Sequence, residues 1–245
     1  MFEWNEDAIR YRIDAAEEVG FDALIASHIV PHIGRDDHVC DAGAGLGFLS
    51  FALSPFCKCI TAVEQDQTAF DVLRYLAKHR GYENVLAKRG DLFAMKPETP
   101  YDAMVFCFFG KVEETLFAVK NQCRGKAVLI KRAHGGRRFS VAEAAHTRLS
   151  FQTAAAQLTK LGIPFETETF SVDMGQPFST LQDAENFFRI YGKKGLHYTR
   201  QEVVNRLTRT GSGRFPYYLP SQRPLGMIVL DAKDIPVSFA ENPAE

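Results

Sequence analysis

The sequence contains no apolar run long enough to cross a membrane. Its longest unbroken apolar stretch, residues 103–109, falls far short of the roughly 20 residues that a membrane span requires. The opening residues MFEWNEDAIR are acidic and polar, so they lack the basic start and apolar centre of a secretory leader. These absences predict a cytoplasmic protein without a membrane partner.

Cysteine is scarce and poorly spaced for metal or redox chemistry. Cys57 and Cys59 are too close together for a C-x-x-C pair, and Cys40, Cys107 and Cys123 stand in or beside apolar runs. A cysteine in such a run is usually a small core residue, so we expect all of them to be reduced. No cluster of His, Cys, Asp and Glu has the spacing of a metal site.

Neither sign of charge dominates the chain. The formal net charge of -1 provides no overall field to attract nucleic acid or an anionic membrane, although it leaves room for a local basic patch. Hydrophobic residues make up 46% of the 245 residues, which is enough for a sizeable core. The length suits one large domain or one domain with an insert.

Short apolar runs alternate with amphipathic stretches along most of the chain. Strands are predicted at residues 38–43, 59–66, 84–91, 101–109, 125–132, 164–174 and 225–233. Helices are predicted at residues 5–33, 48–54, 67–81, 111–122 and 140–161. This alternation predicts an α/β fold with a doubly wound, mostly parallel, seven-stranded sheet flanked by helices.

The strand–helix rhythm divides the chain into three parts. Residues 1–36 form an N-terminal helical segment, and residues 37–175 with 223–235 form the Rossmann-like core. Between the last two strands lies an insert, residues 176–222, with helices predicted at 179–191 and 199–210 and a loop at 211–224. We expect this insert to cover one face of the core as a substrate-recognition cap.

The first predicted strand runs into VCDAGAGLGFLS, where glycines stand at alternate positions. A dinucleotide-binding turn would need its third glycine at position 48, which is Phe48. No Gly-Lys-Ser/Thr follows, which excludes a Walker-type phosphate loop. The G-x-G-x-G spacing therefore argues against an NAD-dependent dehydrogenase.

The stretch Asp41-Ala42-Gly43-Ala44-Gly45-Leu46-Gly47 resembles the first motif of class I S-adenosylmethionine (SAM)-dependent methyltransferases. Glu64 at the end of the second strand, Gly90-Asp91-Leu92 after the third, and Tyr101-Asp102-Ala103-Met104-Val105-Phe106 in the fourth match that family at the right distances. The resemblance covers roughly residues 20–175 and the final strand. It implies a methyltransferase that uses SAM and releases S-adenosylhomocysteine (SAH).

The resemblance assigns these residues to the cofactor site: Asp41, Gly43, Gly45, Gly47, Glu64, Gln65, Asp91, Leu92 and Phe106. In that assignment Glu64 accepts hydrogen bonds from both ribose hydroxyls, Asp91 from the adenine amino group, and Asp41 faces the ammonium group. Each acid also has a plainer interpretation. Glu64 could be a solvated strand end, Asp91 the cap of a turn, and Asp41 a helix cap.

No catalytic residue stands out. Many amine-directed members of the family carry Asp/Asn-Pro-Pro-aromatic after the fourth strand, where this chain has Phe106-Cys107-Phe108-Phe109-Gly110. That difference argues against methylation of a nucleic-acid amine by their mechanism. Candidate substrate contacts, each with a purely structural alternative, are Tyr11, Phe108, His134, Arg137, His197 and Tyr198. Arg132, Arg137 and Arg138 could bind an anionic group or form a solvated basic loop.

Three hypotheses of function follow. The first is a methyltransferase for a small molecule. The second is an RNA or protein methyltransferase that uses the basic, aromatic-rich insert to contact its substrate. The third is a non-catalytic SAM-binding or regulatory protein with this fold. The sequence indicates neither the methyl acceptor nor the oligomeric state.

Overall fold

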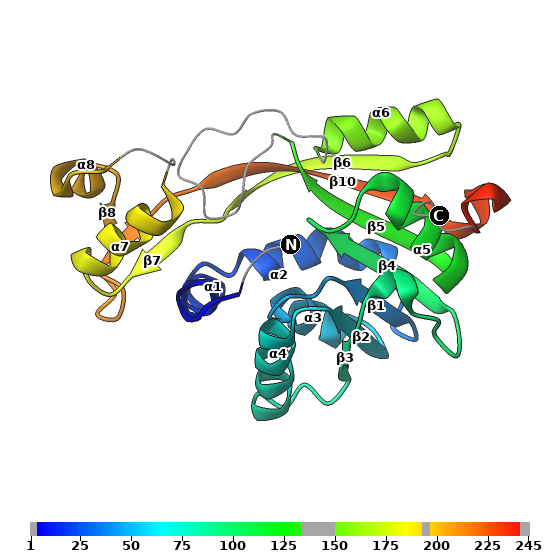
Figure 1. Ribbon diagram of the computed structural model, residues 1–245, viewed down its shortest axis with the longest axis horizontal. Helices are drawn as coiled ribbons and strands as arrows, with labels where there is room; N and C mark the ends of the chain where they lie inside the picture. Colours follow the sequence, from blue (N-terminus) through cyan, green and yellow to red (C-terminus); the bar gives the residue numbers. More distant parts are fainter. Residues whose placement is uncertain (1–3, 134–149, 193–196, 241–245) are drawn as a thin grey trace.

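The computed structural model describes residues 4–133, 150–192 and 197–240, and its centre is a seven-stranded sheet of order β3-β2-β1-β4-β5-β10-β6 (Figure 1). The strands are β1 (His38–Ala42), β2 (Cys59–Glu64), β3 (Val85–Arg89), β4 (Tyr101–Cys107), β5 (Cys123–Arg132), β6 (Glu166–Asp173) and β10 (Gln222–Asp231). Strands β1 to β5 pair in parallel, whereas β10 runs antiparallel to both of its neighbours. The structure confirms the predicted fold class.

Helices cover both faces of the sheet. They are α1 (Glu6–Val19), α2 (Phe21–Ile29), α3 (Phe48–Leu53), α4 (Gln67–His79), α5 (Val112–Gln122) and α6 (Phe151–Leu161). Short 3-10 turns are η1 (Val30–His32), η2 (Ser54–Phe56), η3 (Leu92–Ala94), η4 (Ala232–Asp234) and η5 (Val237–Ala240). Helices α2, α3 and α4 pack on one face, and α5 and α6 pack on the other. Among the described helices, none has the length and apolarity of a membrane span.

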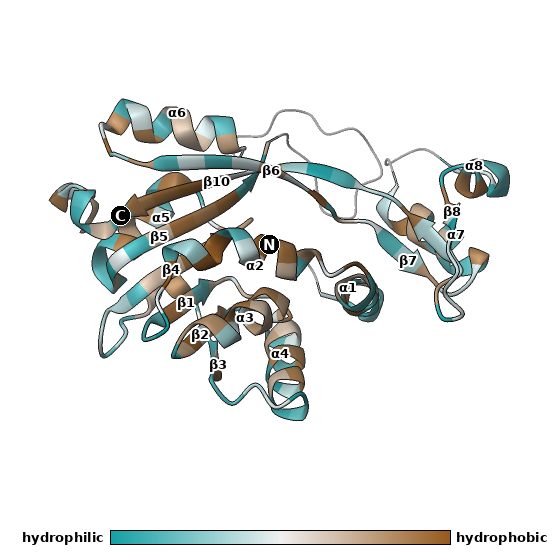
Figure 2. Cartoon of the chain, turned by 180° about the vertical axis from the view of Figure 1, so that it is seen from behind, coloured by the Kyte–Doolittle hydropathy of each residue, from teal (hydrophilic) through white to brown (hydrophobic). Residues whose placement is uncertain are grey.

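The continuous apolar character of β4 reflects burial on both sides. Ala103 and Val105 pack with α2 and α3, whereas Met104 and Phe106 pack with α5. All four side chains are at most 1% exposed. Figure 2 shows this apolar character across β4, β5 and β10, while the edge strand β6 is more polar.

The N-terminal helical segment is broken once. Gly20 adopts a left-handed conformation (φ 69°, ψ 21°), ends α1 and begins α2. A residue with a Cβ atom is disfavoured in that conformation. The turn at Gly20 brings Asp22 of α2 to Arg12 of α1, a detail that helical periodicity over residues 5–33 did not predict.

The insert contains a small sheet that the sequence did not predict. Its elements are β7 (Gln176–Phe178), α7 (Leu181–Tyr191), α8 (Arg200–Val204), β8 (Thr208–Arg209) and β9 (Tyr217–Leu219). The strands pair antiparallel in the order β7-β9-β8. The prediction of one helix over 199–210 was therefore wrong after Val204, and the predicted loop 211–224 contains β9 and the start of β10.

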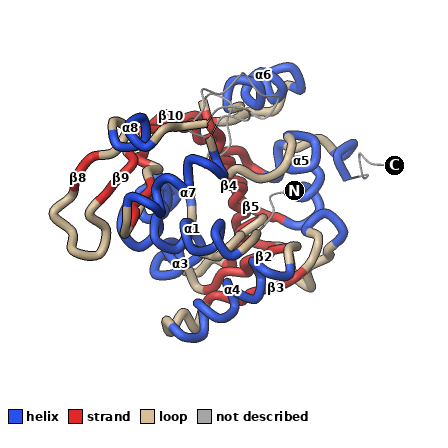
Figure 3. The backbone as a smooth tube through the Cα atoms, turned by 60° about the vertical axis from the view of Figure 1, so that its left-hand side comes forward, coloured by secondary structure: helices blue, strands red, loops and turns tan. Residues whose placement is uncertain are grey.

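The insert lies beyond one end of the long strands β6 and β10 and contacts α1 (Figures 1 and 3). Tyr11 of α1 is fully buried there, with its ring centroid 5.0 Å from that of Phe187. Its hydroxyl donates to Asp183, whose carboxylate also pairs with Arg10 at 2.7 Å. Helix α1 is thus held between the core and the insert.

Candidate functional site

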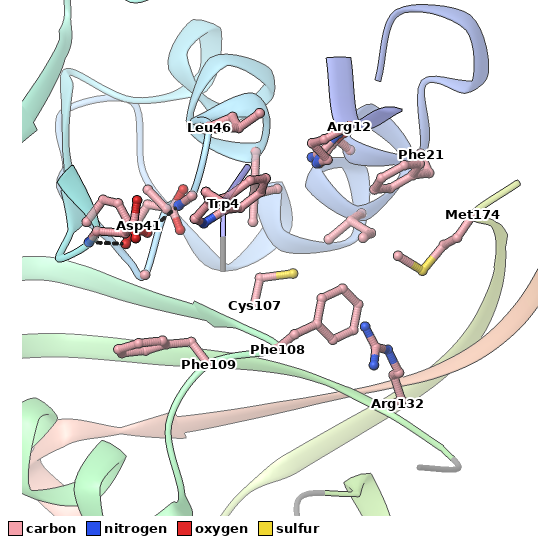
Figure 4. Close-up of a pocket in the computed structure, with 18 residues that line it drawn as sticks. Trp4, Arg12, Phe21, Asp41, Leu46, Cys107, Phe108, Phe109, Arg132 and Met174 are labelled. Atoms are coloured by element: carbon pink, nitrogen blue, oxygen red, sulfur yellow. Dashed lines mark hydrogen bonds and ion pairs between the residues drawn. The ribbon is translucent and has the colours of Figure 1, made fainter. Parts of the chain in front are cut away.

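A cavity of about 420 Å³ lies at the carboxyl ends of β1, β2, β4 and β5, next to the N-terminal helices (Figure 4). This is where parallel α/β sheets bind their ligands, and the volume suits a small molecule. Asp41 of β1 and Leu46 of the glycine loop line it at one end, and Arg132 and Met174 line it at the other, with Phe108 beside Arg132. Glu64, at the end of β2, also lines it.

The glycine loop turns β1 into α3 through left-handed backbone. Gly43, Gly45 and Gly47 have φ angles of 70°, 57° and 86°. A Cβ on Gly43 would lie 2.3 Å from the ring of Phe109, and one on Gly47 would lie 2.9 Å from Phe51 and Leu73. Glycine is therefore required here both by the backbone conformation and by close packing.

The carboxylate of Glu64 is held in a fixed orientation beside this loop. One oxygen accepts from the backbone N–H of Gly45 and the other from that of Asp66, both at 2.8 Å. A carboxylate has about four acceptor positions, so each oxygen keeps capacity for a second donor. Glu64 lines the cavity and can accept hydrogen bonds from a diol there.

Asp41 places a second carboxylate in the cavity wall. It is 2% exposed and accepts from the hydroxyl of Ser50 at 2.6 Å. Burial raises the pKa of Asp41, the hydrogen bond from Ser50 lowers it, and the nearby charges of Asp22 and Glu64 raise it; the resulting pKa is about 6. A cation bound in the cavity would lower this pKa again.

An ion pair between α1 and α2 forms another part of the wall, which sequence analysis did not identify. The guanidinium of Arg12 pairs with Asp22 and lies 4.8 Å and 4.6 Å from the ring centroids of Phe21 and Phe48. Arg12 Nη1 and Asp22 Oδ2 have no hydrogen-bond partner among the residues that the structure describes. The two residues meet because the chain turns at Gly20 between the two helices, so periodicity carries no signal for them.

The turn after β4 carries an unusual backbone. Phe108 has φ 57°, which is rare for a residue with a Cβ atom and is typical of functional sites. Lys131, 3% exposed, donates from Nζ to the carbonyl oxygens of Gly110 at 2.9 Å and Phe109 at 3.4 Å. This buried lysine holds the turn, and the ring of Phe108 lines the cavity.

Several residues that the resemblance assigned to the cofactor do not line this cavity. Gln65 and Asp91 are exposed, whereas Leu92 and Phe106 are buried in the core. The carboxylate of Asp91 accepts from the N–H of Phe93 at 3.0 Å and caps η3, as the plainer interpretation expected. A role for these residues with adenine stays a prediction.

The candidate substrate contacts are dispersed. Phe108 lines the cavity, whereas Tyr11 is buried against the insert. His197 is exposed, and Tyr198 packs on Phe188 with ring centroids 5.2 Å apart; neither lines the cavity. His134, Arg137 and Arg138 lie outside the described residues.

The cavity offers neither a metal site nor a reactive thiol within the part of the chain that the structure describes. No group of three His, Cys, Asp or Glu residues there is arranged to hold a metal ion. All five cysteines are free thiols. Cys107 lines the cavity, but burial raises the pKa of its thiol, so it stays protonated and is a poor nucleophile.

The strand order, the antiparallel β10, the glycine loop after β1 and the acid at the end of β2 together define the fold of class I SAM-dependent methyltransferases. No family model matches the chain. Solved structures of this fold with a TM-score of 0.50 or more share 11–16% identity with the chain, so the likeness establishes the fold alone.

Three of these structures illustrate the range of the fold. The YcgJ protein from Bacillus subtilis has a TM-score of 0.54 and 13% identity, covering 86% of this chain and 98% of its own. Geranyl diphosphate methyltransferase in complex with SAM has a TM-score of 0.50 and 12% identity, covering 86% and 85%. The [4+2]-cyclase SpnF has a TM-score of 0.52 and 11% identity, covering 85% and 80%.

One curated relative matches over a short region. Protein-L-isoaspartate O-methyltransferase of Nitrobacter winogradskyi is 35% identical over 66 residues, which is 27% of this chain and 30% of the relative. The chain therefore matches less than a third of that relative's length.

Proposed function

We propose that the chain binds SAM in the described cavity and transfers its methyl group to a small molecule. One observation carries this proposal: the left-handed glycine loop uses the N–H of Gly45 to hold the carboxylate of Glu64 at the cavity. A fixed carboxylate with spare acceptor capacity suits the two ribose hydroxyls of the cofactor. The methyltransferase structure that contains SAM supports the choice of ligand.

The charged wall residues suit the amino-acid end of the cofactor. That end carries one ammonium and one carboxylate group. Asp41 and Asp22 are buried acids that the ammonium would neutralise, and Arg12 Nη1 is an unpaired donor for the carboxylate. The orphaned atoms of the Arg12–Asp22 pair gain partners when such a zwitterion binds.

Adenine would extend from Glu64 towards the end of β3. Asp91 and Leu92 follow that strand, which pairs with β2. The carboxylate of Asp91 keeps acceptor capacity beyond its bond to Phe93, and this capacity suits an exocyclic amino group.

SAM supplies a methyl group on a positively charged sulfur, which is already activated for displacement. The protein then contributes by aligning the acceptor and excluding water. The rings of Trp4 and Phe108, which line the cavity, can stabilise a nearby cation. No described lining residue is a histidine, and Lys131 is bound to two carbonyl oxygens. The arrangement favours an acceptor atom that needs little help in losing a proton.

The insert, residues 176–222, acts in this proposal as a cap that works through α1. Its described residues do not line the cavity. They instead hold α1 through Asp183, and α1 supplies Arg12 to the cavity wall. A cytoplasmic location is part of the same proposal, since the free cysteines suit a reducing compartment.

Calorimetric titration with SAM and SAH tests the cofactor assignment. We expect micromolar binding of SAH, weakened about 10- to 100-fold in Glu64→Gln, because hydrogen bonds to a charged group are worth roughly 1.5–3 kcal/mol. The exposed Glu83→Gln is the matched control and should bind normally. Absence of SAH binding by the folded protein would sink the proposal.

A SAM-binding protein that does not transfer a methyl group is the second candidate. The described cavity wall contains no histidine, and the solved cyclase has the same fold. SAH binding without any SAM-to-SAH conversion across small-molecule acceptors would favour it.

RNA as the acceptor has weaker support. In the insert Arg200 pairs with Glu185, Arg214 pairs with Glu17, and Arg209 stacks on Tyr217. These cations already have partners within the chain.

A further inference from the structure

Arg132 brings a positive charge to the end of the cavity opposite Glu64. It is the last residue of β5, and its guanidinium lies 4.8 Å from the ring centroid of Phe108. Among the described residues it forms neither a salt bridge nor a side-chain hydrogen bond. The other arginine in the wall, Arg12, is paired with Asp22.

Stacking occupies only the face of the guanidinium. Its five N–H donors point outward in the plane and stay available for a bidentate contact with a carboxylate or phosphate. Burial, together with the positive charge of Arg223, lowers the pKa of Arg132 to about 10. The group is still charged at neutral pH, and among the described residues only the ring of Phe108 offsets its desolvation, so an anion in the cavity would gain a strong partner.

The position of Arg132 separates it from the ribose end of the site. Strands β2, β1, β4 and β5 are consecutive neighbours in the sheet. At roughly 4.8 Å per strand, the end of β5 lies about 14 Å from the end of β2, where Glu64 stands. The walls near Arg132 are apolar and include Phe108 and Met174. Ile25 also lines the cavity and belongs to the same buried cluster as Met174.

We propose that Arg132 binds a carboxylate or phosphate group of the methyl acceptor, whose apolar part lies against Ile25, Phe108 and Met174. This inference rests on the proposed function, because it assigns the β1–β2 end of the cavity to SAM. It names the acceptor class: a small amphipathic anion. The left-handed turn at Phe108 serves this site by presenting the ring to Arg132 and to the cavity.

The test uses three probes of similar shape: benzoate, phenyl phosphate and neutral benzamide. Each is titrated into the free protein and into the protein saturated with SAH. We expect at least one anion to bind about tenfold or more tightly than benzamide. The stronger of the two anions identifies the head group. Equal binding of all three probes, or none, would overturn the inference.

Variants then locate the contact. Arg132→Gln should lose about tenfold or more of the anion affinity and bind benzamide unchanged, and Arg132→Lys should retain part of it. Arg223→Gln is the matched control, because Arg223 stands nearby on β10 but does not line the cavity. Thermal unfolding of each variant checks that it is folded. Unchanged anion affinity in both Arg132 variants would refute the inference.

SAH affinity separates the two proposals. Normal SAH binding by Arg132→Gln, with lost anion binding, supports both. Loss of about tenfold in SAH affinity in this variant would assign Arg132 to the cofactor's own carboxylate and overturn the acceptor inference. Anion binding at Arg132 in a protein that never binds SAH would leave the anion site standing and refute the proposed function.

Discussion

At the scale of single residues, the site combines groups that a sequence motif identifies with groups that it misses. The motif predicted the glycine loop, Asp41 and Glu64, because their spacing follows from local strand–turn–helix geometry. The motif did not identify Arg12 and Asp22, since their pairing depends on how the chain turns at Gly20. The lack of an acidic partner for Arg132 among the described residues depends on every neighbour in the cavity, so its role could not be predicted from the sequence.

Asp41 makes stability depend on pH. In the unfolded chain it loses its proton near its ordinary pKa of about 4, whereas in the fold it keeps the proton up to about pH 6. The native state therefore binds more protons in this window, and the free energy of unfolding falls as pH rises through it.

Asp41→Asn should remove this fall, which amounts to about 3 kcal/mol. The amide oxygen of asparagine can still accept from Ser50. Urea unfolding of both proteins at pH 4 and pH 7 measures the difference. Parallel pH profiles for the two proteins would contradict the prediction.

Lys131 should stabilise the turn after β4. Lys131→Met keeps the aliphatic stem but leaves the carbonyls of Phe109 and Gly110 without their donor. We expect a loss of about 1–3 kcal/mol in the free energy of unfolding. Lys126→Met, a substitution on the same strand, serves as the control in urea unfolding. Equal, small losses of unfolding free energy in the two variants would show that the hydrogen bonds of Lys131 do not stabilise the turn.

At the scale of elements, long periodic segments were predictable and short ones were not. Strands β1 to β6 and helices α4 and α5 lie within one to three residues of their predicted bounds. Strands β7, β8 and β9 have three residues or fewer, which is too short to establish a period of two. They form because β9 pairs with β8 and also with β7, which is far away along the chain: Gln176 of β7 is the register partner of Leu219 of β9.

Gly20, between α1 and α2, and Gly47, before α3, allow backbone strain to be compared with steric clash at a junction between elements. Gly20 and Gly47 both have positive φ, but a Cβ on Gly20 meets nothing within 4 Å, whereas one on Gly47 meets Phe51 and Leu73 at 2.9 Å. Gly20→Ala should therefore cost only backbone strain, about 1–2 kcal/mol. Gly47→Ala should cost more because the core must also shift, and it should weaken SAH binding. Chemical denaturation of both variants measures the difference, and equal losses would contradict it.

At the scale of the whole molecule, α1 couples the insert to the cavity. Trp4 and Arg12, from or beside this helix, line the cavity, and Tyr11 on the same helix is buried against the insert. This coupling could not be predicted from sequence, because Tyr11 and Asp183 are 172 residues apart. The role of Tyr11 as a substrate contact stays a prediction.

Tyr11→Ala should loosen this coupling. We expect a loss of about 3–5 kcal/mol in the free energy of unfolding, together with weaker SAH binding and faster hydrogen exchange in α1 and β7. Tyr11→Phe keeps the ring among its aromatic neighbours and should lose only about 1 kcal/mol. SAH affinity that stays normal in Tyr11→Ala would show that the insert does not control the cavity.

The way in which the insert joins the sheet has a consequence for the protein's diversification. Asp173 and Gln222, on either side of the insert, are register partners in the antiparallel pair β6–β10. The carboxylate of Asp173 also accepts from the N–H groups of Gly175 and Ser221. In topological terms the whole insert is the enlarged tip of the β-hairpin formed by β6 and β10. Changes in its length and sequence that keep the contacts with Tyr11 would therefore leave the register of the sheet and the glycine loop as they are.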